Sequence, residues 1–168
     1  MSAGRLQGKV VMVTGATSGL GRVTARALAA MAPRVYLVAR NEARARETVA
    51  AIVGETGNDD IHILLADLSS QADVRRVAEE FLATGDPLHV LCNDAGAISK
   101  LHRQVSVDGI ETTIALNHLA YYTLTLLVLP RLRASAPARI VNVASDAYKD
   151  AKGRFPFDDY NAERKYTP

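Results

Sequence analysis

Short apolar runs alternate with longer amphipathic segments along this 168-residue chain. Continuously apolar runs, the pattern of strands buried on both faces of a sheet, occupy residues 9–14, 34–39, 61–66, 88–93 and 138–144. Between them, apolar residues recur every three or four positions over 20–32, 42–57, 70–85 and 108–133. The pattern therefore predicts five strands that alternate with four helices.

Local signals mark several helix ends. Asn41 is a typical N-cap, and Ser70 with Asp73 three residues later resembles a capping box. Gly54 and Gly57 are expected to close the second helix. These boundaries separate each predicted helix from the strands beside it.

Alternating strands and helices predict an α/β fold: a parallel sheet with helices on both faces. Right-handed crossovers and a glycine loop after the first strand indicate a Rossmann-like sheet of order 3-2-1-4-5. We expect residues 1–168 to form a single dinucleotide-binding domain. Ligands of such sheets bind outside the carboxyl ends of the strands.

The loop 14–21 (TGATSGLG) joins the first predicted strand to the first helix. Gly15 permits a tight turn, Gly19 lets the backbone approach a pyrophosphate, and Gly21 lets the helix pack close to the strand. The helix N-terminus then offers free N–H groups to phosphates. The candidate contacts are Gly15, Thr17, Ser18, Gly19, Leu20 and Gly21. The alternative is a turn that uses glycine for geometry alone.

Arg40 follows the second strand, at the position that meets the ribose 2′ group of a dinucleotide. A cation there suits a 2′-phosphate, whereas NAD would require an acidic residue. NADP(H) is therefore the expected cofactor and NAD the less favoured one. Alternatively, Arg40 is a solvated residue that pairs with Glu42.

Polar or small residues also follow the third and fourth strands. Asp67, beside Leu68, could accept a hydrogen bond from an adenine amino group or could serve a turn. In the NDAG sequence at 93–96, the small residues let the loop lie close to a nicotinamide ribose, or form an ordinary turn. The candidates there are Asn93, Ala95 and Gly96.

The longest predicted helix begins near Asp108 and Glu111, either of which can cap it. Residues 114–129 are apolar almost all round, but this run is shorter than the roughly 20 residues of a membrane span. Burial of this helix between the sheet and a second subunit explains the apolar run better. We therefore expect no membrane span and a surface for homodimer formation on this helix.

Composition limits the remaining possibilities. The net charge of +2, with acidic and basic residues mixed, gives no case for binding nucleic acid. The single cysteine, Cys92, cannot form an internal disulfide and lies in an apolar run, so we expect an inert thiol and a cytoplasmic location. No metal site is predicted, and the expected partner is a small-molecule substrate.

Four pieces of sequence together resemble the short-chain dehydrogenase/reductase family. They are TGATSGLG after the first strand, NDAG after the fourth, Asn117 in the long helix, and Ser145 after IVNVA. NDAG departs from the family's usual Asn-Asn-Ala-Gly by one residue. LNHL at 116–119, the run 135–145 and FDD at 157–159 are similar to the retinol-dehydrogenase-like branch.

The resemblance implies hydride transfer between nicotinamide and a substrate carbon. By the same resemblance, Ser145 hydrogen-bonds the substrate oxygen and Asn117 holds a proton-relaying water. A Tyr acts as acid/base, and a Lys in a Tyr-x-x-x-Lys pair lowers its pKa from about 10. The branch implies NADP(H) and a lipophilic carbonyl or alcohol substrate, in agreement with Arg40.

The Tyr-x-x-x-Lys pair departs from this pattern. The formal match Tyr148/Lys152 follows Ser145 too closely, and Gly153 leaves no long helix to hold it, so we treat it as a decoy. Tyr160 has only Arg164 four residues later. We expect a chain that stops before the catalytic helix and is inactive or nearly so. The alternative is a non-catalytic NADP-binding or dimer-partner protein, or an inactive remnant.

Overall fold

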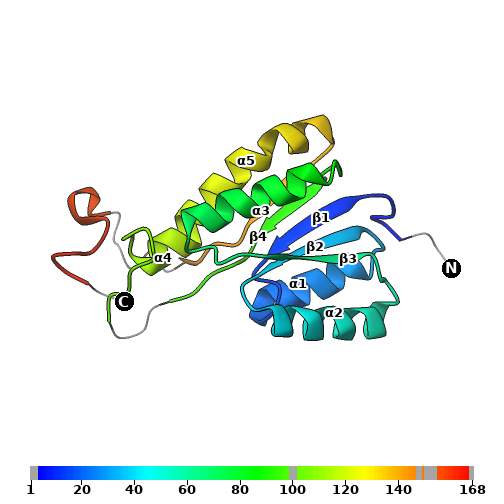
Figure 1. Ribbon diagram of the computed structural model, residues 1–168, viewed down its shortest axis with the longest axis horizontal. Helices are drawn as coiled ribbons and strands as arrows, with labels where there is room; N and C mark the ends of the chain where they lie inside the picture. Colours follow the sequence, from blue (N-terminus) through cyan, green and yellow to red (C-terminus); the bar gives the residue numbers. More distant parts are fainter. Residues whose placement is uncertain (1–3, 99–101, 147–148, 150–154, 167–168) are drawn as a thin grey trace.

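A computed structural model describes residues 4–98, 102–146, 149 and 155–166 (Figure 1). The strands are β1 (Val10–Thr14), β2 (Arg34–Ala39), β3 (Ile61–Leu65), β4 (Val90–Asn93) and β5 (Arg139–Asn142). The helices are α1 (Gly19–Ala29), α2 (Glu42–Thr56), α3 (Gln71–Ala83), α4 (Thr112–Ile114) and α5 (Ala120–Ala134). A π-helical segment, Ala115–Leu119, joins α4 to α5, and a 3₁₀ turn spans Phe157–Asp159. The elements follow the predicted alternation along the chain.

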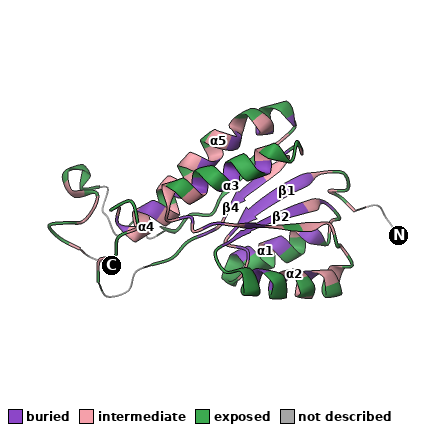
Figure 2. Cartoon of the chain, viewed as in Figure 1, coloured by how far each residue is buried: buried purple, intermediate pink, exposed green. Residues whose placement is uncertain are grey.

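The strands form one parallel sheet of order β3-β2-β1-β4-β5, as predicted. Helices α1 and α2 lie on one face, and α3 and α5 lie on the other (Figure 1). All five residues of β1 are buried. Val11 and Val13 pack with the α1–α2 layer, whereas Met12 packs with the α3–α5 layer. Figure 2 shows this burial concentrated in the central strands.

The helix ends agree with the sequence at most positions. Asn41 caps α2, because its side-chain oxygen accepts a hydrogen bond from the Arg44 N–H at 2.9 Å. Gly57 ends α2 with φ +72°, but Gly54 lies inside the helix, so its predicted role as a terminator is wrong. Ser70 caps α3 through the Asp73 N–H at 3.3 Å.

Two acidic side chains cap differently from the prediction. Asp73 does not complete a reciprocal capping box, because its carboxylate accepts from the Asp67 N–H at 2.8 Å. Asp108 accepts from the Gln71 N–H at 2.8 Å, at the start of α3. Only Glu111 caps the long helix, accepting from the Ile114 N–H at 2.9 Å.

The long helical stretch runs over Thr112–Ala134, 23 residues, and by length and composition it could cross a membrane. The apolar run was expected to be too short, but the helix as a whole is not. Four of its residues at intervals of four, Ala120, Leu124, Val128 and Leu132, are buried in the core that α3 shares. This stretch is therefore part of the α/β fold described here.

Strand β5 forms one edge of the described sheet. It is shorter than the predicted run 138–144, and all four of its residues are exposed. Ile140, Val141 and the following Val143 present apolar surface to solvent. Within the described residues, β5 is therefore an exposed edge with apolar side chains.

Candidate functional site

A cavity of about 450 Å³ lies at the carboxyl ends of β1, β2, β3 and β4. We call it the glycine-loop cavity. Every predicted cofactor residue except Asn93 lines it: Gly15, Thr17, Ser18, Gly19, Leu20, Gly21, Arg40, Asp67, Leu68, Ala95 and Gly96. The parallel sheet has therefore gathered four separate predicted loops around one space.

The glycine loop requires glycine at three positions. Gly15 has φ +69°, and a Cβ there would lie 2.7 Å from the Ala95 Cα. A Cβ on Gly21 would clash with the Gly15 carbonyl. Gly19 has φ +51° with no protein atom within 4 Å of an added Cβ. Gly15 and Gly21 thus permit close packing, while Gly19 leaves space over the loop.

The N-terminus of α1 faces this cavity without a side-chain cap. Ser18 is the N-cap residue, with φ −155° and ψ 168°, and its hydroxyl makes no capping hydrogen bond. The first turn of α1 contains no acidic residue. Its backbone N–H groups and positive dipole end can therefore receive an anion such as a phosphate.

Arg40 reaches toward Asp67 across the same cavity, with 3.9 Å between its Nη1 and the carboxylate. The alternative pairing with Glu42 is not formed, because Glu42 instead accepts from Arg46 at 2.6 Å. Asp67 also accepts from the N–H of Ser69 at 3.0 Å. Asp67 therefore shapes its turn and lines the cavity at once.

Asn93 lies beneath the cavity and not on its wall. Its side chain has 0% exposure and donates to Thr125 Oγ1 at 3.1 Å and Asn142 Oδ1 at 2.8 Å. The loop after it is held by Thr14, whose hydroxyl accepts from the N–H groups of Asp94 and Ala95 at 2.9 and 3.0 Å. Thr14 was missed as a positioning residue, although its place just before Gly15 was the available signal.

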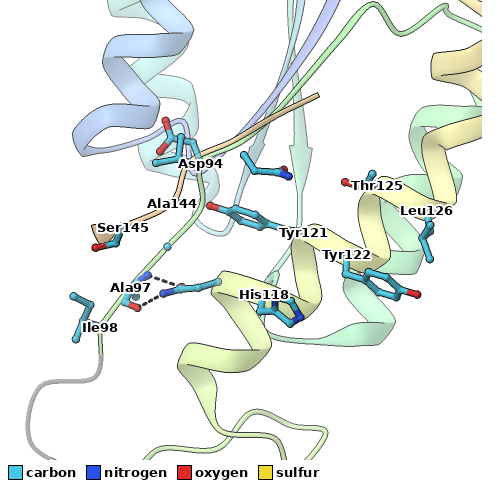
Figure 3. Close-up of a pocket in the computed structure, with 14 residues that line it drawn as sticks. Asp94, Ala97, Ile98, His118, Tyr121, Tyr122, Thr125, Leu126, Ala144 and Ser145 are labelled. Atoms are coloured by element: carbon cyan, nitrogen blue, oxygen red, sulfur yellow. Dashed lines mark hydrogen bonds between the residues drawn. The ribbon is translucent and has the colours of Figure 1, made fainter. Parts of the chain in front are cut away.

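A second cavity of about 790 Å³ adjoins the first (Figure 3). We call it the β5–α5 cavity. It is lined by Asp94, Gly96, Ala97, Ile98, Asn117, His118, Tyr121, Tyr122, Thr125, Leu126, Asn142, Val143, Ala144 and Ser145. Asp94, Gly96, Ala97 and Val143 also line the glycine-loop cavity. Both predicted catalytic residues, Asn117 and Ser145, therefore lie next to the predicted cofactor site.

The Asn117 side chain holds the loop at the junction of the two cavities. Its oxygen accepts from the Ala97 N–H at 3.0 Å, and its nitrogen donates to the Ala97 carbonyl at 2.9 Å (Figure 3). Asn117 lies in the π-helical segment, a helical distortion that is frequent at functional sites. Both polar atoms of the Asn117 side chain thus hold the backbone of Ala97 in place.

Tyr121 was not predicted as a site residue, yet it lines the β5–α5 cavity. Burial, with smaller contributions from Asp94 and Cys92, raises the pKa of Tyr121 to about 12. An acid/base phenol working near neutral pH needs a lowered pKa. Tyr121 is therefore poorly suited to replace a catalytic tyrosine.

The other tyrosine candidates do not supply the missing pair. Tyr148 and Lys152 lie outside the described residues. Tyr160 is exposed, and Arg164 is paired with Asp158 at 2.7 Å. Within the described part of the chain, no cluster of side chains is suited to hold a metal ion. Burial, reinforced by Asp94, raises the pKa of the Cys92 thiol, which fits an unreactive cysteine.

The parallel sheet, with its glycine loop and two adjoining cavities at the carboxyl ends of the strands, defines a Rossmann-like α/β domain. The chain matches the family described as short chain dehydrogenase over residues 9–162, and it belongs to that family of oxidoreductases. Human retinol dehydrogenase 12 is 40% identical over 163 residues, covering 97% of this chain and 51% of that protein. Mouse polyprenol dehydrogenase is 41% identical over 165 residues, covering 96% and 48%.

Solved structures show the same fold. An RhlG–NADP complex of Pseudomonas aeruginosa has a TM-score of 0.75 at 29% identity and covers 95% of this chain and 63% of that one. A metagenomic short-chain oxidoreductase in complex with NADP has a TM-score of 0.73 at 30% identity, covering 83% and 63%. The chain spans about half the length of the curated relatives given above.

The residues present fit a nicotinamide dinucleotide. The open space over Gly19 and the uncapped N-terminus of α1 suit a pyrophosphate. The Asp67 carboxylate and the Arg40 guanidinium supply an acceptor and a cation after the neighbouring strands β3 and β2, in the same cavity. The chemistry of the donor set therefore agrees with the family.

Proposed function

We propose that this chain is the cofactor-binding part of an NADP(H)-dependent oxidoreductase acting on a lipophilic alcohol or carbonyl compound. The observation that carries the proposal is the junction of the two cavities. The glycine-loop cavity shares Asp94, Gly96, Ala97 and Val143 with the cavity that contains Asn117 and Ser145. A cofactor bound in the first cavity and a substrate bound in the second would meet at these residues.

Each residue at the junction has a separate task in this proposal. The bound nicotinamide would supply or accept the hydride. Ser145 would hydrogen-bond the substrate oxygen. Asn117 would fix the Ala97 backbone, since both polar atoms of its side chain bond to that residue. Thr14 would hold the loop from the other side through Asp94 and Ala95.

Arg40 supports NADP(H) over NAD. No acidic residue replaces it at the end of β2, and the Arg40 side chain lines the glycine-loop cavity. Two similar solved structures are NADP complexes. The nearby Asp67 carboxylate lies 3.9 Å away and leaves room for an anion to compete for the guanidinium.

The lining of the β5–α5 cavity supports a lipophilic substrate. Ile98, Tyr122, Leu126 and Val143 contribute exposed apolar or aromatic surface there. The names of two relatives, retinol dehydrogenase and polyprenol dehydrogenase, describe enzymes of apolar alcohols. Apolar lining with few polar groups is typical of sites for such molecules.

We further propose that residues 1–168 alone bind cofactor without appreciable catalysis, because the only Tyr-x-x-x-Lys match is the poorly placed Tyr148/Lys152. Robust NADPH-dependent carbonyl reduction by this polypeptide, lost on Tyr148→Phe, would contradict that statement. A cytoplasmic location remains part of the proposal and rests on the single unpaired cysteine.

Titration of NADPH fluorescence tests the cofactor site. Gly19→Ala places a methyl group in the open space over the loop, so we expect affinity to fall at least about tenfold, or 1.4 kcal/mol. Gly57→Ala is the matched control, because Gly57 also has positive φ and an open Cβ position but lies at the end of α2. Equal affinities for the two variants, or no NADPH binding by the parent chain, would refute the proposed site.

A second candidate function is that of a non-catalytic NADP-binding partner that dimerises through the long helix. The exposed side chains of Tyr122 and Leu126 on α5 favour it. Catalytic activity in a longer chain that carries a downstream Tyr-x-x-x-Lys helix would decide for the enzyme. Cofactor binding without activity in such a chain would decide for the partner.

A further inference from the structure

Asp94 places a carboxylate at the junction of the glycine-loop cavity and the β5–α5 cavity, because it lines both of them. It is also the residue at which NDAG departs from the family's usual Asn-Asn-Ala-Gly. Figure 3 shows its side chain at the start of the loop that leads from β4 to Ala97. In the proposed function only the backbone N–H of Asp94 has a role, as a donor to Thr14. The carboxylate itself has no task there.

The charge of this carboxylate is not neutralised by a neighbouring cation. Asp94 Oδ2 accepts from the Thr24 hydroxyl of α1 at 3.5 Å, a long hydrogen bond to a neutral group. Among the described residues, Asp94 forms no ion pair, whereas Asp67, the other carboxylate of the glycine-loop cavity, has Arg40 at 3.9 Å. The backbone of Asp94 is held by Thr14 at 2.9 Å. An unpaired negative charge is therefore held at the junction.

Asp94 is ionised at neutral pH. Burial raises the pKa of its carboxyl, and the hydrogen bond from Thr24 opposes that rise. An ordinary aspartate has a pKa of about 3.9, so neutrality at pH 7 would require a rise of about three units, which is typical of full burial. Asp94 is only partly buried. Its charge also adds to the effect of burial in raising the pKa of Tyr121 to about 12, so its field extends into the β5–α5 cavity.

The layout of the glycine-loop cavity indicates which end of a bound dinucleotide would lie near Asp94. Arg40 and Asp67, after β2 and β3, suit the adenosine end, and the open space over Gly19 suits the pyrophosphate. The nicotinamide end would then extend past Gly96 toward the end of β4. Hydride transfer requires the nicotinamide ring to face a substrate in the β5–α5 cavity. The ring would therefore occupy the junction that Asp94 lines.

We propose that the Asp94 carboxylate sets the balance between the two redox states of the cofactor by strengthening the binding of NADP⁺ relative to NADPH. The inference rests on the proposed function, because it concerns the same cofactor. The nicotinamide ring is positively charged in NADP⁺ and neutral in NADPH. A fixed negative charge near the ring therefore attracts only the oxidised form. Repulsion between Asp94 and the phosphates is common to both forms and cancels in the ratio of their affinities.

This balance gives the site a preferred direction. In the oxidoreductase proposed above, reduction of a carbonyl compound consumes NADPH and one proton and leaves NADP⁺ and the alcohol. Tighter binding of NADP⁺ shifts the equilibrium between the bound reactants and products toward the alcohol by the same factor. An asparagine in place of Asp94 would lack this bias, because its amide carries no charge.

The test compares the affinities of the 168-residue chain for NADPH and NADP⁺. Fluorescence titration measures the first, and displacement of bound NADPH measures the second. Asp94→Asn removes the charge, keeps the backbone N–H that donates to Thr14, and introduces the family's usual residue. We expect NADP⁺ affinity to fall at least about fivefold and NADPH affinity to change less than about twofold. Thermal unfolding of the variant checks that the fold is kept.

Asp59→Asn is the matched control. Asp59 is exposed and lies just before β3, at the amino end of the strand, whereas both cavities lie at the carboxyl end of the sheet. The substitution makes the same change in net charge. It should leave the ratio of the two affinities unchanged. An equal shift of the ratio by Asp59→Asn would attribute the effect to net charge and overturn the inference.

The remaining outcomes separate this inference from the proposed function. If the parent chain binds NADPH and Asp94→Asn leaves the ratio of NADP⁺ to NADPH affinity unchanged, the inference is wrong and the proposed function stands. If Asp94→Asn weakens both forms equally, Asp94 only shapes the loop, and the inference is also wrong. If the parent chain binds neither form, both proposals fail.

Discussion

His89 illustrates how a single side chain ties two strands together. It lies just before β4, and its Nδ1 accepts a hydrogen bond from the Val10 N–H of β1 at 3.0 Å. This bond requires the neutral ring with Nδ1 unprotonated. Burial, and secondarily the charge of Lys9, lowers the pKa of His89. The folded state therefore favours the neutral imidazole.

This linkage predicts that the chain loses stability on mild acidification. The unfolded chain takes up a proton at His89 near pH 6.5, whereas the folded chain resists it, so stability falls as the pH drops below about 6.5. The loss of an acceptor for a buried N–H can cost up to about 1–3 kcal/mol. Urea unfolding at pH 7.5 and at pH 5.5 measures this loss of stability.

His89→Asn provides the comparison for that prediction. The Asn oxygen can occupy the place of Nδ1 but does not titrate, so the drop in the urea midpoint between the two pH values should shrink. A drop of unchanged size would assign the pH dependence to other groups.

At the scale of elements, α5 shows why an apolar sequence does not reveal which side chains are buried. Leu124 is 1% exposed and packs with α3 in the core, whereas Leu126, two residues later, is 48% exposed. The π-helical segment before α5 also sets the rotation of the helix and brings Asn117 to Ala97. The same helical stretch thus contributes buried side chains to the core and places Asn117 at the site.

We predict that Leu124→Ala lowers the free energy of unfolding by about 2–5 kcal/mol, because it leaves a cavity in the core. Leu126→Ala, the same change on the exposed side, should cost less than about 1 kcal/mol. Urea unfolding of the two variants measures the difference. Comparable losses would show that this face of α5 is covered in solution.

At the scale of the whole molecule, the β5 edge is the most exposed part of the sheet. Its residues are exposed along the entire strand, and the apolar surface continues onto Tyr122 and Leu126 of α5. Unprotected apolar edges promote pairing between chains. The same surface borders the cavity that contains Ser145.

We therefore expect the 168-residue polypeptide to self-associate as its concentration rises, and Val141→Lys to suppress this by placing a charge on the edge. Val23→Lys is the matched control, since Val23 of α1 is 53% exposed against 47% for Val141. Sedimentation velocity measures the mean mass. Equal suppression by both variants would attribute the effect to net charge and not to the β5 edge.

Much of the fold was predictable because its signals are local. The apolar runs predicted the parallel strands, Asn41 and Ser70 correctly marked helix starts, and the glycine loop located the cavity. Each of these signals depends on backbone geometry within a few residues or on strand alternation. Gly54 failed as a terminator because glycine is also tolerated inside a helix.

The sequence by itself thus determined the strand order, the glycine loop and the family of this protein. Only the tertiary structure decided that Asn93 is buried and bonded to Thr125 and Asn142, and that Asp108 caps α3. The physical reason is the distance along the sequence over which each interaction acts. Hydrophobic periodicity and capping act over one or two turns, whereas these contacts arise when elements distant in sequence pack against each other.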